Sequence, residues 1–214
     1  MMRALRMAAT VGAVLAATVG RAVAQAPEAR LLAIHDDATR DMVRSFVEAA
    51  RARGTPTEPL VARALQGVVF KADRKAIEQA MVRLEKNLRR SHDLLGAQAT
   101  LDEVSAGADA LSSGVSEKAI LELRQAARHR PITVELGVLT ELVAKGVPPK
   151  RAAEQVRALM ARGATGAQLT ELNAAVQQDV ALGVSPIAAL ELRGRGVMSL
   201  LPPPISATAA QPRP

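Results

Sequence analysis

The residues whose types suit chemistry are few and lie apart in the sequence. His35 precedes Asp36 and Asp37, and His92 precedes Asp93. Adjacent residues of a helix point about 100° apart, so neither run brings its side chains together on one face. A metal site needs convergent ligands, and no His-x-x-x-His or Glu-x-x-His pair accompanies either histidine. We interpret these residues as helix caps or solvated groups and predict no metal site.

Sequence signatures of catalysis are also missing. The chain has no nucleophile elbow, no phosphate-binding glycine loop and no dinucleotide-binding fingerprint. Gly194-Arg195-Gly196 follows a helical pattern rather than a strand, so we interpret this run as a helix stop. We predict a protein without enzymatic activity and without a cofactor. The alternative is a hydrolase whose serine, carboxylate and histidine (His35 or His92) come together only in the fold.

One stretch concentrates the positive charge. Residues 71–90 hold seven basic and three acidic side chains, whereas the remainder of residues 25–214 holds 18 of each. In a helix over 73–95 an apolar stripe forms from Ile77, Met81, Leu84, Leu88 and Leu95. Cations spread over the other side of this segment and are the candidate binding residues for an anionic membrane surface or envelope polymer: Lys71, Lys75, Arg83, Lys86, Arg89 and Arg90.

A second interpretation of the same helix needs no ligand. Its apolar stripe then packs in a core, and its charged side is solvated and carries pairs such as Arg74–Glu78 and Glu85–Arg89. Nucleic acid is not predicted as a partner, because the chain has only two aromatic residues to stack on bases.

The first 24 residues have the three zones of a cleavable secretory signal peptide. Arg3 and Arg6 precede an apolar run over 7–20, and Ala22-Val23-Ala24 forms a small-x-small cleavage site. The run is short for a permanent membrane anchor, and the absence of cysteine excludes a cysteine-linked lipid. We therefore expect export to the periplasm or secretion, with a buried N-terminal helix as the alternative.

Glycine punctuation predicts where helices end and begin. Gly146, Gly163 and Gly183 each end a helical pattern, and a residue suited to starting the next helix follows two positions later. Thr100 with Glu103, and Thr165 with Gln168, have the spacing of a capping box, and Thr133 is a further candidate cap. The expected helices span residues 37–53, 58–69 (interrupted at Gly67), 73–95, 100–112, 116–129, 133–145, 149–162, 166–182 and 186–193.

These patterns predict an all-α fold without a β-sheet. Gly114, Gly146 and Gly183 are spaced by 32 and 37 residues, which is the size of a two-helix repeat. We expect residues 25–200 to form an irregular stack of short helical hairpins, similar to an α-solenoid, or else a compact helical bundle. Residues 201–214 are rich in Pro and Ala and are expected to be a disordered tail.

The functional prediction combines these observations. We expect an exported, non-enzymatic interaction or scaffold module that binds a protein partner in the cell envelope along a helix-lined groove. The alternative is a peripheral envelope protein that binds anionic lipid or polymer through helix 73–95.

Overall fold

The structure is a computed structural model, and it describes residues 27–128 and 130–202. Within these residues it contains helices and no strand, which confirms the all-α prediction. The predicted signal peptide and residues 203–214 of the predicted tail lie outside the described residues. The helices are α1 (Pro27–Leu31), α2 (Asp37–Ala52), α3 (Glu58–Val69), α4 (Arg74–Leu95), α5 (Leu101–Ser112), α6 (Glu117–Ala126), α7 (Thr133–Ala144), α8 (Pro149–Ala161), α9 (Gly166–Ala181) and α10 (Pro186–Leu200).

Local hydrogen bonds account for most helix boundaries. The Asp73 carboxylate accepts a hydrogen bond from the Ala76 amide at 2.7 Å and starts α4. Both predicted capping boxes are formed, at the starts of α5 and α9. The three repeat-spaced glycines have φ of 89°, 93° and 93°, a conformation that side chains disfavour and that lets the chain turn back after each helix.

One predicted cap and one predicted helix end near the middle of the chain are wrong. Thr133 does not cap α7 but is its first residue, and Ile132 occupies the cap position. The Ile132 amide instead donates to the carboxylate of buried Glu103, at 2.9 Å across the fold. Helix α6 ends at Ala126, three residues earlier than expected. A contact distant in sequence therefore decides how this turn is built.

Two glycines that suggested breaks lie inside continuous helices. Helix α10 runs through Gly194 and ends at Leu200, so the prediction of a stop at this glycine is wrong. Gly194 is buried, and a Cβ there would overlap the side chain of Gln155 on α8. Gly67 likewise does not interrupt α3, and a Cβ at that position would lie 2.7 Å from Ile77. Both glycines allow close helix packing.

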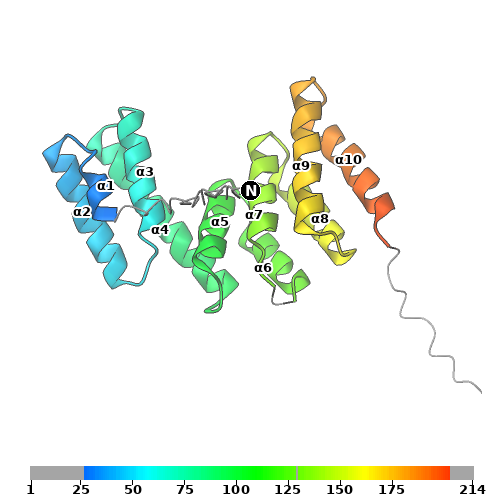
Figure 1. The fold of residues 1–214 in the computed structure, drawn as a ribbon, viewed down its shortest axis with the longest axis horizontal. Helices are drawn as coiled ribbons and strands as arrows, with labels where there is room; N and C mark the ends of the chain where they lie inside the picture. The colour runs from blue at the N-terminus through cyan, green and yellow to red at the C-terminus, as the bar shows by residue number, and fades with distance from the viewer. Residues whose placement is uncertain (1–26, 129, 203–214) are drawn as a thin grey trace, which may run out of the picture.

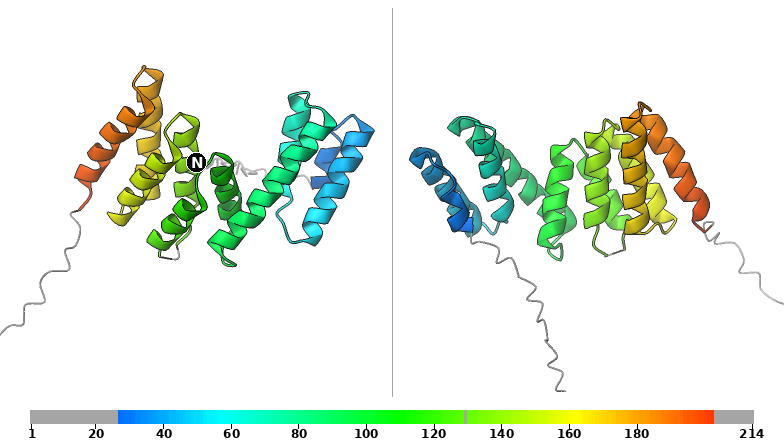
Figure 2. Two further views of the ribbon diagram at one scale, coloured as in Figure 1. Left: turned by 180° about the vertical axis from the view of Figure 1, so that it is seen from behind. Right: turned by 45° about the horizontal axis from the view of Figure 1, so that its top comes forward.

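The helices form an extended stack with two layers in its C-terminal part (Figure 1). In one layer α5 packs beside α7, and α7 beside α9; in the other, α4, α6, α8 and α10 follow one another. Helices α2 and α10 lie at opposite ends in all three views (Figures 1 and 2). This extended arrangement is compatible with the predicted stack of helical hairpins.

The core consists of two apolar clusters that meet at α4 and α5. Leu88 and Val104 belong to the N-terminal cluster, whereas Leu95 and Ala110 belong to the C-terminal one. The predicted stripe of α4, from Ile77 to Leu95, is buried as expected. Helix α4 thus joins the two parts of the stack and has no apolar stripe left for another surface.

Candidate interaction surfaces

The cations predicted on α4 do not converge on one site. Arg90 forms an ion pair with Glu117 of α6, with Nε 2.6 Å from Oε1. The hydrogen bond from Arg90 lowers the pKa of Glu117, and the same bond raises the pKa of Arg90. Glu85 accepts hydrogen bonds from Arg53, the residue that follows α2, the nearer one at 2.6 Å, rather than from Arg89 as expected. These pairs connect neighbouring helices.

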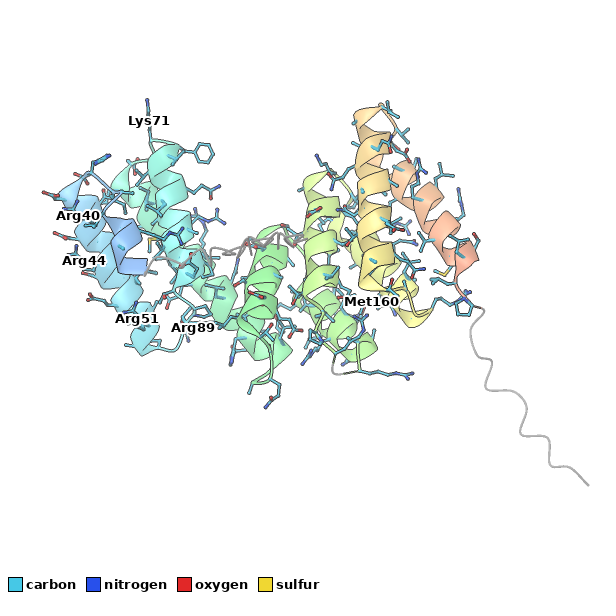
Figure 3. The ribbon with its side chains drawn as sticks, in the orientation of Figure 1. Arg40, Arg44, Arg51, Lys71, Arg89 and Met160 are labelled. Carbon is cyan, nitrogen blue, oxygen red and sulfur yellow. The ribbon has the colours of Figure 1, made fainter. Side chains whose placement is uncertain are left out.

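The other predicted cations are exposed and form a row. Lys75, Lys86 and Arg89 face solvent on α4, as does Arg83. From Lys75 to Arg89 the helix rises by about 21 Å. Figure 3 shows Lys71 projecting from the α3–α4 turn, well away from Arg89. The structure therefore offers a solvated basic row rather than a pocket.

The histidine–aspartate runs behave as helix ends. The Asp36 carboxylate caps α2 by accepting a hydrogen bond from the Thr39 amide at 2.7 Å. Hydrogen bonds from the Thr39 side chain and then from its amide lower the pKa of Asp36. His35 and His92 are exposed. Across residues 27–128 and 130–202, no group of three His, Asp or Glu side chains is arranged to hold a metal ion. In the same residues, no helix is both long enough and apolar enough to cross a bilayer.

A hollow of about 450 Å³ lies among α3, α4 and α5. Partial burial raises the pKa of Asp109 on its α5 side, and nearby Arg63 of α3 opposes this shift. The leucines of α4 that reach the hollow, Leu84 and Leu88, are already buried in the core. A segment bound here would therefore gain little apolar contact area. The lining residues are Pro59, Ala62, Arg63, Gln66, Leu84, Leu88, Ser105 and Asp109.

The largest concentration of exposed apolar side chains lies at the C-terminal end of the stack. Five of the twelve large apolar residues that are exposed in the described chain fall between positions 182 and 200. Along α10, Ala188, Leu192, Gly196 and Leu200 follow one another at four-residue spacing and are all exposed. The five large residues are Leu182, Val184, Ile187, Leu192 and Leu200.

Two of these five residues, Val184 and Leu192, have buried counterparts in earlier repeats, whereas Leu190 of α10 is buried and its α6 counterpart Leu121 is 39% exposed. The segments 114–124 and 183–193 share eight of eleven residues, including the run Leu-Glu-Leu-Arg. Our prediction of the helices did not use this repeat, which relates the residues of α10 to those of α6. Val184 is 38% exposed, whereas Val115 and Val147 are 3% and 1% exposed. Leu192 is 56% exposed, whereas Leu123 is fully buried.

The difference arises because α6 has a neighbour on the side where α10 has none in the described chain. Helix α8 packs beside α6, and Arg157 of α8 lies 3.5 Å from the Glu122 carboxylate. Ala119 and Glu122 line the α6–α8 contact, and they correspond to Ala188 and Glu191 of α10. The outer face of α10 is thus a repeat interface without its second helix.

The inner face of α10 is held firmly. Arg193 donates two hydrogen bonds to the Asp179 carboxylate of α9, at 2.7 and 2.6 Å. These bonds lower the pKa of Asp179 and raise that of Arg193. Arg162 also donates to the carbonyl oxygens of Leu201 and Pro202 just after α10. Both interactions fix the helix and leave its outer face available.

Comparisons of the chain with models of protein families, with curated proteins and with solved structures find no match. We therefore derive the function from these surfaces.

Proposed function

We propose that the protein is an exported, non-enzymatic interaction module that binds a protein partner in the cell envelope. The partner contributes a helix that packs on the outer face of α10 and extends the even-numbered layer. The exposure of Leu192 and Val184, whose counterparts are buried in earlier repeats, is the observation that carries this proposal. Contiguous exposed apolar surface of this kind is typical of protein-binding sites.

The repeat geometry also suggests the chemistry of the partner helix. It takes the place that α8 has beside α6, so it carries a basic side chain opposite Glu191, as Arg157 lies opposite Glu122. Ala188 and Gly196 present little side-chain bulk, which allows two helices to approach closely. We expect small and medium apolar residues on the contacting side of the partner.

Site-specific photocrosslinking in the native envelope tests this proposal. A photoreactive residue at Leu192 is expected to yield one discrete protein adduct that persists in high salt. The same residue at Ala174, which is exposed on α9 several residues away from the Asp179 contact with α10, is the control and is expected to yield none. Adducts of equal yield at both positions, or at neither, would overturn the proposal.

A charge substitution separates binding from folding. Leu192→Asp places a carboxylate in the proposed contact, so we expect the adduct formed from a neighbouring probe at Ala188 to disappear. The unfolding midpoint is expected to stay unchanged because Leu192 is exposed.

The second candidate function is binding of anionic lipid or polymer through the basic row of α4. It is supported by the exposure of Lys75, Lys86 and Arg89, none of which takes part in the ion pairs described above. Charge reversal at these three positions is expected to abolish a salt-sensitive association with anionic vesicles. Arg90 is left unchanged, because its pair with Glu117 joins α4 to α6.

A further inference from the structure

The turn between α3 and α4 exposes an apolar pair beside several cations. Val69 and Phe70 are 76% and 73% exposed, and Phe70 is one of the two aromatic residues in the whole chain. Lys71, Arg74 and Lys75 follow directly and are exposed. Lys71 points away from the body of the protein at the tip of this turn (Figure 3).

The backbone of this turn is well defined. The Lys71 amide donates to the Val68 carbonyl at 2.9 Å, and the Ala72 amide donates to the Gly67 carbonyl at 2.9 Å. This is the same pair of bonds that closes the turn at Gly146, where the Gly146 and Val147 amides bond to Val143 and Leu142. The exposed pair therefore sits on a rigid support.

Lys71 occupies the position that glycine occupies in the other turns of this type. Its φ is 55°, in the left-handed region that glycine adopts readily and other residues adopt at a cost. In the described chain only Arg128 shares this feature among non-glycine residues. The side chain placed by this backbone conformation is a cation that lies directly beside the exposed apolar pair.

We propose that the α3–α4 turn inserts into the surface of an anionic lipid bilayer. Val69 and Phe70 enter the boundary between headgroups and acyl chains, while Lys71, Arg74 and Lys75 contact lipid phosphates. Asp73 is the acidic residue within this segment, and it is engaged in capping α4. Charge complementarity thus favours an anionic bilayer over a neutral one.

This site goes beyond partner binding at α10 and lies in the N-terminal part of the stack, remote from α10 (Figure 1). It also differs from binding through the α4 row, because it requires apolar insertion. The apolar stripe of α4 is buried in the core, so that helix supplies cations without an apolar face to insert.

A single tryptophan tests the insertion directly, since the chain has no Trp or Tyr. In the full chain carrying Phe70→Trp, we expect a blue shift of emission on phosphatidylglycerol vesicles and quenching by brominated acyl chains. We expect neither effect on phosphatidylcholine vesicles. The matched control is Leu101→Trp, a comparably exposed position at the first residue of α5, which is expected to show no shift and no quenching.

Two further variants distinguish insertion from general adhesion. Phe70→Ala is expected to weaken vesicle binding by about tenfold or more, because burial of a phenylalanine side chain contributes at least roughly that factor. Lys71→Gly is expected to weaken binding by about fivefold, the contribution of one cation near the surface, while raising the unfolding midpoint because glycine relieves the strained φ.

Three results would overturn the proposal: no blue shift at position 70, equal quenching at position 101, or unchanged binding of Phe70→Ala. If the probe at Leu192 gives no crosslink but Trp at position 70 still inserts into the vesicles, only the proposed function at α10 is contradicted.

Discussion

At the scale of single residues, the contact between α4 and α5 limits which side chains can replace Gly107. Gly107 of α5 lies against Ser91 of α4 where the two core clusters meet, and a Cβ at 107 would overlap the Ser91 hydroxyl. That hydroxyl is buried and has no hydrogen-bond partner in the structure. Helices α4 and α5 can therefore pack this closely only because residue 107 has no side chain.

We predict that Gly107→Ala destabilises the protein by about 2 kcal/mol, because the added methyl overpacks the crossing. Gly137→Ala is the control: this α7 position has open space around it, and alanine favours the helix by about 0.5–1 kcal/mol. Urea unfolding measures both changes. Adding Ser91→Ala to Gly107→Ala is expected to restore much of the loss, and the absence of any rescue would contradict the steric explanation.

The pair between Asp179 and Arg193 predicts a pH dependence. The folded-state pKa of Asp179 lies below its ordinary value of 3.8, because Arg193 stabilises the carboxylate. Its contribution to stability is therefore present above that value and is lost as the pH falls through the folded-state pKa. We predict that Asp179→Asn lowers the unfolding midpoint at neutral pH and has progressively less effect below pH 3.8. An effect that stays constant in acid would contradict this assignment.

At the scale of elements, α6 and α10 have similar sequences but different neighbouring helices. Helices α6 and α10 begin with the same motif, yet α8 covers the former and no described helix covers the outer face of the latter. Leu123 is consequently a core residue of α6, whereas its counterpart Leu192 lies on the surface of α10.

We predict that Leu123→Ala lowers the free energy of unfolding by about 3 kcal/mol, as expected for a buried leucine. Leu192→Ala is expected to change it by less than about 0.5 kcal/mol. Thermal or urea unfolding of the two variants, measured side by side, checks the difference. A similar loss from both would mean that α10 is covered in solution, for instance by a second copy of the chain.

At the scale of the whole molecule, the stack is built from neighbour contacts. Helix α7 packs against α5, α8 and α9, whereas α1 packs against α2 and α3 at one end and α10 against α8 and α9 at the other. In such an array each unit is stabilised mainly by the units beside it. The interior helices therefore have support on both sides.

We predict that amide hydrogen exchange is slowest in α7 and becomes faster toward α1 and α10. Hydrogen–deuterium exchange with mass spectrometry gives this profile directly. Uniform protection along residues 27–202 would contradict it, since it would indicate that the stack opens only as one unit. Bound partner at α10 is expected to slow exchange first in α9 and α10.

Much of the secondary structure was predictable from the sequence, because its determinants are local. Asp73, Thr100 and Thr165 cap helices through bonds to amides three residues ahead, and Gly146 ends a helix through its own backbone conformation. The buried stripe of α4 was equally predictable, because apolar residues that recur with a period near 3.6 indicate a helix with one buried side.

Tertiary packing alone decided the remainder. Gly194 lies inside α10 where a side chain would meet Gln155 of α8, and the Ile132 amide at the start of α7 donates to the carboxylate of Glu103. Which copy of a repeated leucine is exposed also depends on which described helices pack beside it, and the residue's own sequence segment does not contain that information. The candidate surfaces at α10 and at the α3–α4 turn are of this kind: each is defined by apolar side chains that no neighbour in the described chain covers.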